Sequence, residues 1–328
     1  MLPFETIKRT VIEKIPAETS PKFGKKPEDR TIPELLDGGI VNVDKPDGPT
    51  SHEISAFVQK ILHVKKSGHS GTLDPGVTGV LPVALGKSTK IVQMLLPAGK
   101  EYIAVMHIHD DVAEGKVRDT IKKFVGKITQ LPPVRSAIKR QHRQRTIYHV
   151  DVLEIDGRDV LMKVGCEAGT YIRKLCHDIG EQLGTGAHMA ELRRTKAGPF
   201  DESTLATLHD LIDAYWFWKN EGKEKYLRKV VQPMENATKH LPHIWVLDTT
   251  VDSLAHGATL HMPGISKFES DINVDDIVAV MTLKGELVCY GKSHATSEDL
   301  KIKDKGIAVV PLRVFIEPGT YPKIERKK

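Results

Sequence analysis

Cysteine is scarce in this sequence, and long apolar runs are missing. Its three cysteines (Cys166, Cys176 and Cys289) are too few for a disulfide framework, so we expect a reducing compartment. Cys176-His177 has no second cysteine pair at zinc-site spacing, which argues against a structural metal. No apolar run reaches the roughly 18 residues that a membrane span needs. Residues 1–15 also lack the apolar core of a signal peptide, so we expect neither a secreted chain nor a membrane-spanning one.

Positively charged residues only slightly outnumber negatively charged ones. The chain carries 48 Lys and Arg against 43 Asp and Glu, which gives a formal net charge of +5 and a pI of about 8.9. This balance is compatible with a polyanionic partner but does not identify one. The length of 328 residues exceeds the size at which a single core stops growing, so we expect two domains.

The pattern of elements changes along the chain. Residues 1–33 are rich in Lys, Glu and Pro, which predicts an extended arm. Residues 34–241 alternate strand-like and helix-like segments, which predicts an α+β domain. After Pro242, short strands separated by Gly and Pro continue to Ile316, which predicts a small all-β module.

Apolar spacing predicts the elements of the larger domain. Intervals of three and four residues are typical of helices, and continuous or alternating apolar runs are typical of strands. The expected helices cover residues 51–62, 117–128, 172–183 and 205–218. The expected strands cover residues 39–43, 102–109, 147–155 and 160–164. We expect Thr170 to cap the third helix and Gly184 to end it.

The most informative stretch is His-Ser-Gly-Thr-Leu-Asp-Pro-Gly at residues 69–76. Pro75 and Gly76 predict a tight turn, and Asp74 stands on it between apolar segments. A loop held by packed elements fixes the direction of a carboxylate, which suits a nucleophile or a base. The same residues also suit an ordinary turn in which Asp74 bonds to its own backbone, and the loop alone leaves both readings open.

Five segments resemble the motifs of the TruB/dyskerin pseudouridine synthases and occur in the order of that family. The segments are Asp44–His52, His69–Gly79, Lys100–Tyr102, Gly169–Arg173 and His188–Thr195. The resemblance implies a mixed, largely antiparallel sheet with flanking helices. It also implies that Asp74 is the catalytic aspartate, that Tyr102 is the active-site tyrosine and that Arg173 is the basic partner of the aspartate.

The module after Pro242 resembles a PUA domain, an RNA-binding β-barrel. The similar segments are His256–Ala258, Met262–Ile265, Asp275–Val278 and Gly285–Gly291. Together with the N-terminal arm, this module resembles the archaeal dyskerin homologues, which are catalytic subunits of H/ACA guide ribonucleoproteins. The implied organisation is an arm at 1–33 that packs on the PUA domain, a catalytic domain at 34–241, a PUA domain at 242–322 and a basic tail at 323–328.

The implied reaction breaks the N1–C1′ bond of uridine and forms a C5–C1′ bond. Because no electrons are exchanged with a second molecule, we expect no cofactor and no metal. Asp74 would either attack C1′ or remove the 2′ proton, and the sequence leaves both open. A guanidinium at Arg173 within about 4–6 Å would favour the ionised carboxylate. Tyr102 would offer an aromatic face to the flipped uracil and a hydroxyl near C5.

Three further residues complete the implied substrate site. Tyr171 and Leu192 are expected to form walls of the uracil pocket, and His69 to fill the space that the uridine leaves or to hold the loop. Structural readings stay open beside these roles: Tyr102 suits an ordinary strand, Arg173 a solvated helix face, and Tyr171 and Leu192 the core.

Basic residues are concentrated near these motifs, and residues 134–148 contain no acidic side chain. One-sided runs of this kind favour phosphate contact over a merely solvated loop, and such contacts position RNA rather than read its sequence. The expected RNA-binding residues are Lys65, Lys66, Arg135, Lys139, Arg140, Arg143, Arg145, Arg193 and Arg194.

Three hypotheses follow. The first is a guide-dependent pseudouridine synthase that acts on rRNA or tRNA, with an H/ACA guide RNA, a zinc-ribbon-like protein, a β-barrel protein and a kink-turn-binding ribosomal-type protein held through the RNA. The second is a stand-alone tRNA T-loop enzyme. The third is a non-catalytic RNA scaffold, against which the intact Asp74, Tyr102 and Arg173 argue.

Only three residues, Arg326-Lys327-Lys328, follow Glu325. Eukaryotic relatives carry long Lys-rich tails, so we expect a cytoplasmic archaeal protein rather than a nucleolar one.

Overall fold

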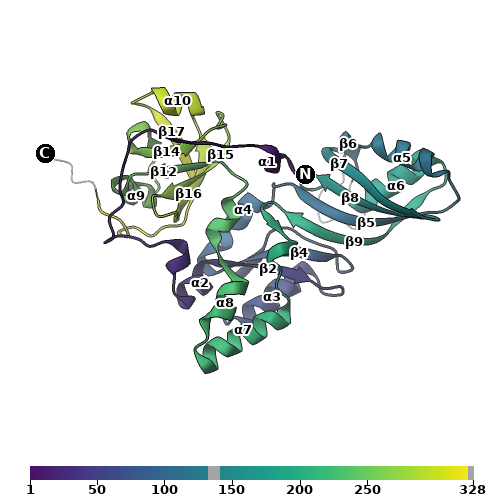
Figure 1. Cartoon of the computed structure of the whole chain (residues 1–328), viewed down its shortest axis with the longest axis horizontal. Coiled ribbons are helices and arrows are strands. Elements are labelled where there is room, and N and C mark those ends of the chain that lie inside the picture. Colours follow the sequence, from purple (N-terminus) through teal and green to yellow (C-terminus); the bar gives the residue numbers. More distant parts are fainter. Residues whose placement is uncertain (132–140, 324–328) are drawn as a thin grey trace. The chain divides into compact units, whose positions relative to one another are not determined.

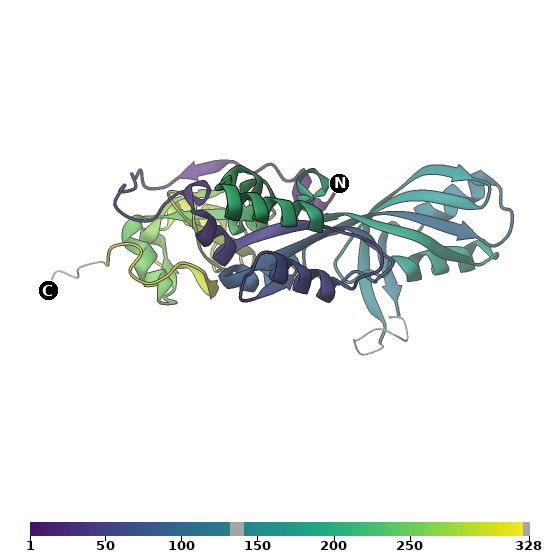
Figure 2. The same ribbon diagram turned by 90° about the horizontal axis from the view of Figure 1, so that it is seen from below.

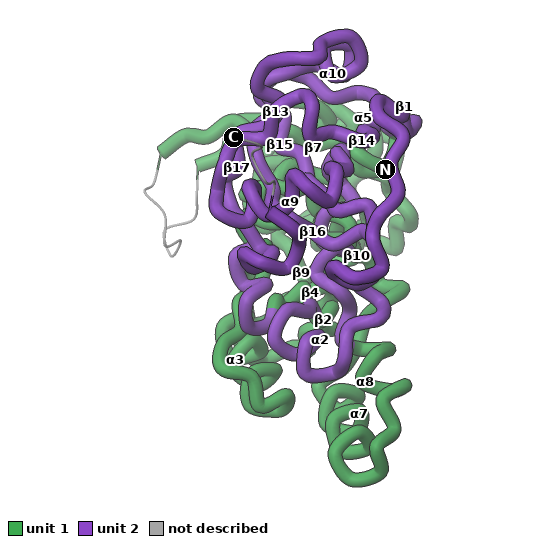
Figure 3. Tube along the Cα trace, turned by 90° about the vertical axis from the view of Figure 1, so that its left-hand side faces the viewer, with its two compact units in different colours: residues 1–6, 41–84, 91–230 green, residues 7–40, 85–90, 231–328 purple. Residues whose placement is uncertain are grey.

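The computed structural model describes residues 1–131 and 141–323. These residues form two compact units, which Figure 3 colours separately. Unit 1 contains residues 1–6, 41–84, 91–131 and 141–230, and unit 2 contains residues 7–40, 85–90 and 231–323. Helices and strands occur in both units, so the expected α+β class is confirmed.

Unit 1 is built on one sheet. Its strands are β2 (Gly39–Lys45), β3 (Ser67–His69), β4 (Thr78–Leu85), β5 (Lys100–Ile108), β6 (Gly126–Gln130), β7 (Arg143–Asp156), β8 (Asp159–Cys166), β9 (Ala187–Ala197) and β10 (Phe200–Asp201). The order is β2-β4-β9-β5-β8-β7-β6, with β3 beside β4 and β10 beside β9. Strands β4 and β9 run parallel, whereas the pairs from β9 across to β6 are antiparallel. The expected mixed, largely antiparallel sheet is therefore confirmed.

Unit 1 also contains helices, some of which pack on this sheet. They are α1 (Pro3–Thr6), α3 (Ser51–Ile61), α4 (Val92–Leu95), α5 (Glu114–Lys122), α6 (Ile172–Leu183), α7 (Leu208–Glu221) and α8 (Glu224–Val230). Figures 1 and 2 show α5 and α6 lying against the strands β5, β8 and β9. Val117 and Ile121 of α5, Leu175 and Ile179 of α6, and Met106 of β5 are buried in one core. This core fixes the start of α6 relative to the sheet.

Two helix ends follow the expected capping chemistry. The Thr50 hydroxyl accepts a hydrogen bond from the backbone N–H of Glu53, while the Glu53 carboxylate accepts one from the Thr50 N–H at 2.8 Å. Helix α6 ends at Gly184, which adopts the left-handed conformation at φ +84°. The predicted start of α3 and the predicted end of α6 are confirmed.

The helix predicted at residues 117–128 is wrong in its second half. Helix α5 stops at Lys122, and Ile128 lies in β6, where it pairs with Arg145 of β7. Gly126 separates the two elements at φ +105°, a conformation that a helix does not contain. The apolar spacing continued by coincidence from the helix into the strand.

One predicted helix cap and one predicted helix start also differ from the structure. Thr170 does not cap α6, because its hydroxyl donates to the Glu167 carbonyl at 2.7 Å and Tyr171 occupies the N-cap position. Helix α7 begins at Leu208 because the Thr207 hydroxyl accepts from the N–H of Asp210. The N-cap of α6 is therefore one residue after the predicted one, and α7 begins three residues after its predicted start.

Unit 2 contains a second sheet. Its strands are β1 (Val11–Glu13), β12 (His243–Val246), β13 (Leu260–His261), β14 (Ile265–Glu269), β15 (Ile277–Thr282), β16 (Leu287–Ser293) and β17 (Ile307–Val314), in the order β1-β14-β12-β15-β16-β17-β13. The remaining elements are β11 (Val231–Pro233), α2 (Ile32–Gly38), α9 (Asp248–Ala255) and α10 (Ser297–Ile302). Helices α9 and α10 add two elements that the strand-only expectation lacked.

Residues 7–40 belong to unit 2, whereas residues 1–6 belong to unit 1. Strand β1 pairs with β14, with Val11 opposite Glu269. The Arg30 guanidinium donates two hydrogen bonds to the Glu235 carboxylate, at 2.7 and 2.8 Å. This pair is mostly buried and planar on both sides, which makes it a stronger link than a surface ion pair. Among the helices of the described residues, none is long and apolar enough to cross a membrane.

Close packing of β4 on β9 requires a glycine. A Cβ atom on Gly79, at φ +101°, would lie 2.2 Å from the Arg194 carbonyl oxygen. Gly48 also has φ +101°, but nothing lies within 4 Å of its Cβ position. We expect Gly48→Ala to lower the free energy of unfolding by about 1–2 kcal/mol through backbone strain, and Gly79→Ala by about 3 kcal/mol or more.

Urea unfolding of the two variants measures this difference. Equal losses of unfolding free energy would contradict the claim that the β4–β9 contact, and not backbone strain alone, selects Gly79.

Candidate active site

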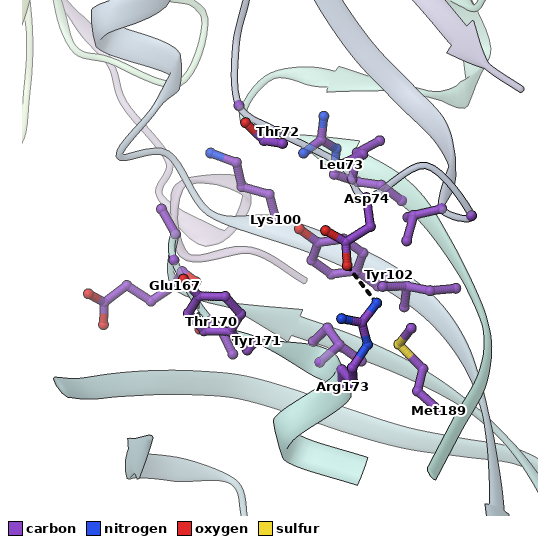
Figure 4. A pocket seen from close by; sticks show the side chains of 18 of the residues that line it. Thr72, Leu73, Asp74, Lys100, Tyr102, Glu167, Thr170, Tyr171, Arg173 and Met189 are labelled. Atoms are coloured by element: carbon purple, nitrogen blue, oxygen red, sulfur yellow. Dashed lines mark hydrogen bonds and ion pairs between the residues drawn. The ribbon is translucent and has the colours of Figure 1, made fainter. Parts of the chain in front are cut away.

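A cavity of about 750 Å³ opens in unit 1 (Figure 4). Its walls are the loop at residues 71–77, strands β5 and β9, and the segment at residues 167–173 that leads into α6. Polar side chains from several of these walls converge on it, including Asp74, Lys100 and Arg173. A concave site with a few convergent polar groups is the usual place for a ligand.

The cavity brings together most of the residues predicted to act on substrate. Asp74, Tyr102, Tyr171, Arg173 and Leu192 all line it. His69 is not among the lining residues, but lies half-buried in β3 just before the loop. Burial lowers the pKa of His69, so its ring is neutral at pH 7.

Asp74 and Arg173 meet directly in the cavity. The Arg173 Nη2 donates to Asp74 Oδ2 at 2.7 Å, which joins positions 99 residues apart in the sequence. Their side chains are 55% and 58% exposed, so a ligand can reach both. Figure 4 shows the Tyr102 ring beside this pair. The arrangement presents an oriented carboxylate next to an aromatic face.

Buried hydrogen bonds hold the Asp74 loop from below. The Ser51 hydroxyl accepts from the Leu73 N–H at 2.8 Å and donates to the Leu73 carbonyl at 3.2 Å. The buried Lys45 ammonium donates to the carbonyls of Pro46, Pro75 and Val77 at 2.8–2.9 Å. These three carbonyls accept all three ammonium protons of Lys45. Backbone carbonyls, and not a carboxylate, therefore tie Lys45 to the loop on either side of Asp74.

A buried amide holds the segment that carries Arg173. The Gln130 carboxamide oxygen accepts from the Tyr171 N–H at 3.0 Å, and its nitrogen donates to the Tyr171 carbonyl at 3.1 Å. Gln130 is the last residue of β6 and is only 2% exposed. This double contact ties the start of α6, and therefore Arg173, to the edge of the sheet.

Two further cations line the cavity from the sheet. Lys100 and Arg194 are 6% and 1% exposed. The Lys100 ammonium donates to the carbonyls of Leu95, Leu96 and Ala98. Burial, together with the nearby Arg194 charge, lowers the pKa of Lys100 to about 7, while the three carbonyls favour the protonated form because they use all its protons.

The RNA-contact prediction is wrong for Arg194. A side chain that is 1% exposed cannot hold a phosphate at the surface, and its Nε donates to the Val80 carbonyl at 2.7 Å. Its neighbour Arg193 points the other way, toward carboxylates of Asp44 at 3.0 Å and Glu202 at 2.7 Å. Alternation along β9 separates the two arginines onto opposite faces.

The other basic candidates have different surroundings. Lys65 and Lys66 are exposed. Arg143 and Arg145 are half-buried on β7, and the Arg145 Nη1 lies 3.6 Å from a Glu167 oxygen. Arg135, Lys139 and Arg140 lie outside the described residues.

The sequence analysis assigned no role to three residues that shape this site, Lys45, Lys100 and Gln130, and it assigned Arg194 to RNA contact. Lys100 could have been found, because alternation along a strand puts it on the same face as Tyr102. Lys45 lies in the first of the family-like motifs. No local pattern marks Gln130, whose partner Tyr171 is 41 residues away.

Groups for metal or thiol chemistry are lacking in the described part of the chain. It contains no cluster of three His, Cys, Asp or Glu side chains that could hold a metal ion. The three cysteines are free and buried, and burial raises the pKa of Cys166, Cys176 and Cys289 to about 12. Thiols with such a pKa are poor nucleophiles at neutral pH.

Four known protein families match segments of the chain. Residues 59–172 match the N-terminal domain of TruB family pseudouridylate synthases, and residues 173–239 match the C-terminal domain of tRNA pseudouridylate synthase B. Residues 242–315 match the PUA domain, and residues 4–55 match the DKCLD (NUC011) domain.

Full-length relatives are similar over nearly the whole chain. The probable tRNA pseudouridine synthase B of Methanopyrus kandleri is 58% identical over 98% of this chain and 95% of its own length. The protein of the same name from Pyrococcus horikoshii is 56% identical over 99% of this chain and 97% of its own.

Solved structures agree with these relatives. A chain from a crystal structure of a Cbf5-Nop10-Gar1 complex is 56% identical, with a TM-score of 0.94 and 99% coverage of both chains. A chain from an H/ACA RNP bound to a substrate RNA containing 2′-deoxyuridine is 53% identical, with a TM-score of 0.92 and coverage of 98% of this chain and 99% of that one.

The Gln130 clamp generates a stability prediction. Gln130→Leu removes the partner of the Tyr171 N–H and one of the two donors to the Tyr171 carbonyl, which keeps its bond from the Leu175 N–H. We therefore expect the free energy of unfolding to fall by about 1–3 kcal/mol. Gln144→Leu on the neighbouring strand β7 is a matched control, because Gln144 is exposed and its loss should change the unfolding free energy by less than about 0.5 kcal/mol. Urea unfolding measures both, and similar small losses for the two variants would contradict the clamp.

Proposed function

The chain belongs to the TruB/dyskerin family of pseudouridine synthases, and we propose that it isomerises uridine in RNA as the catalytic subunit of an H/ACA guide ribonucleoprotein. The observation that best supports this activity is the Asp74–Arg173 pair beside Tyr102 in an open cavity. The observation that supports the assembly is the near-complete structural similarity to a chain of an H/ACA RNP bound to substrate RNA.

The reaction needs a carboxylate next to the glycosidic bond. The N1–C1′ bond breaks with its electron pair going to the base, the base turns, and C5 then bonds to C1′ and releases its proton. All atoms of the uridine except that exchanged proton remain, and no electron acceptor takes part. A cofactor is therefore not required by the chemistry.

Asp74 supplies that carboxylate in our proposal. Its oxygen either attacks C1′ or removes the 2′ proton, and both roles need the ionised form. The Arg173 guanidinium donates to Oδ2, which orients the carboxylate and leaves Oδ1 for the substrate. The target uridine must leave its base stack to bring C1′ to this oxygen.

The other cavity residues receive the base. The Tyr102 ring presents a face for stacking, and Leu192 and Tyr171 supply further walls, which keeps the detached uracil in place while it turns. We assign His69 to supporting the loop, because it does not line the cavity. Lys65, Lys66, Arg143 and Arg145 are proposed to hold the RNA backbone around the cavity.

The guide-dependent function implies an arrangement of domains and partners. We propose that residues 34–241 form the catalytic domain and that residues 242–322 form a PUA domain that grips the guide RNA. The arm at 1–33 would pack on the PUA domain, which the β1–β14 pairing supports. Proteins equivalent to the Nop10 and Gar1 of the similar complex are the expected partners. The archaeal relatives support a cytoplasmic location.

A second candidate function is stand-alone modification of tRNA, which the names of the sequence relatives favour. A tritium-release assay separates the two. We expect release from a target RNA only when its matching H/ACA guide and the partner proteins are present, because pairing with the guide selects the uridine. Full activity of the chain alone on a tRNA transcript would make the guide-only account untenable.

The role of Asp74 is tested by an isosteric change. We expect Asp74→Asn to lower the turnover rate at least about 1000-fold, while the affinity for RNA stays near that of the unmodified chain. Asp119→Asn on α5 is the control, because Asp119 is 74% exposed in its pair with Lys122 and remote from the cavity lining. Turnover that survives Asp74→Asn would mean that another group acts on the ribose.

A further inference from the structure

Arg194 is a buried cation without a carboxylate partner. Its side chain is 1% exposed, and within the described residues no acid forms a salt bridge with it. Nε donates to the Val80 carbonyl, but Nη2 has no hydrogen-bond partner. Removing a guanidinium from water in this way opposes folding, and an apolar side chain of the same size would fill the space at lower cost. Stability alone therefore does not account for a charge at this position.

The guanidinium lies against the side chain of Tyr102. Tyr102 of β5 and Arg194 of β9 are direct cross-strand partners, and both line the cavity. The Arg194 charge acts on the nearby Tyr102 phenol. A guanidinium has only donors, so a hydrogen bond between the two groups runs from Arg194 to the phenol oxygen. The single O–H proton of Tyr102 is then left for a partner on the cavity side.

The electrostatics keep that phenol neutral and polarised. Burial raises the pKa of Tyr102, and the Arg194 charge opposes this rise without cancelling it. Lys100 lines the same cavity, and the Arg194 charge adds to burial in lowering the pKa of Lys100. Positive charge behind a neutral O–H makes it a stronger hydrogen-bond donor toward the cavity.

Negative charge appears in the cavity during the reaction. When the N1–C1′ bond breaks, its electron pair stays on the uracil and spreads over the ring nitrogens and carbonyl oxygens. A donor already aimed at this charge stabilises the transition state without having to reorient. Arg173 donates to Asp74, so we assign its charge to the carboxylate and look to Tyr102 for a donor to the base.

We propose that Arg194 is a positioning residue that acts through Tyr102: by donating to the phenol oxygen, it aims the Tyr102 O–H at the detached uracil. The proposal deepens the function above and rests on it. It does not depend on whether Asp74 attacks C1′ or removes the 2′ proton, because the base carries the charge in both cases. The competing reading is a strut, in which Arg194 only links β4, β5 and β9.

A double-mutant cycle separates the two readings. The variants are Arg194→Met, Arg194→Lys, Tyr102→Phe and Tyr102→Phe with Arg194→Met, each in the full chain within the assembly that is active on RNA. Tyr102→Phe keeps the aromatic face but removes the oxygen. The measured quantities are the single-turnover rate constant for pseudouridine formation, the KM for the target RNA and the melting temperature.

We expect Arg194→Met to lower the rate constant about 10- to 100-fold, less than the 10²–10³ that loss of a direct donor costs, with KM unchanged within about threefold. In the Tyr102→Phe background the same change should lower it less than about threefold, because the oxygen through which Arg194 acts is gone. Arg194→Lys should recover part of the rate. Losses that multiply in the double variant would overturn the proposal in favour of a strut.

Met106→Ala controls for lost stability. Met106 lies in the core on the same strand as Tyr102 and is fully buried, so its truncation should lower the melting temperature. The rate constant should nevertheless stay near that of the unmodified chain. An equal fall for Met106→Ala and Arg194→Met would overturn the proposal. An unmodified chain that is inactive on every RNA would instead refute the proposed function itself.

Discussion

The site depends on one hydrogen bond between two distant segments, from Arg173 to Asp74. Both side chains are more than half exposed, so the contact itself adds little to the stability of the fold. Its geometry must therefore come from the surroundings. Lys45 and Ser51 fix the loop that carries Asp74, and Gln130 fixes the segment that carries Arg173. Lys45, Ser51 and Gln130 are buried and bond to backbone atoms. The backbone positions of Asp74 and Arg173 therefore do not depend on the weak attraction between their two side chains.

The cavity separates its charges by depth. The Asp74 carboxylate and the Arg173 guanidinium are exposed, whereas Lys100 and Arg194, which line the same cavity, are buried. The exposed pair suits a sugar whose glycosidic bond is broken, and the buried cations suit a base that becomes negative. In the proposed function, two parts of one substrate therefore meet two different electrostatic environments in the same cavity. A sheet delivers this arrangement because alternate residues of one strand face the same side.

Much of the site could be predicted from the sequence, but its supports could not. Asp74, Tyr102 and Arg173 stand in short motifs whose residue types and order indicate a family. Arg193 and Arg194 look identical in the sequence, and only the register of β9 against β5, with its bulge beside Tyr102, decides which is buried. The step from α5 to β6 was missed because apolar spacing continued across Gly126. Gln130 acts through a contact between segments far apart in the chain, which no local pattern encodes.

The most direct test of the account is a crystal structure of the Asp74→Asn chain, with its partners, bound to RNA that contains the target uridine. The measured quantity is the distance from the side-chain oxygen of residue 74 to C1′ of that uridine. We predict a distance of about 3–3.5 Å, with the uridine flipped out of its stack and its base against Tyr102. A uridine bound outside the cavity, or a C1′ on the far side of Tyr102 from residue 74, would contradict the central claim.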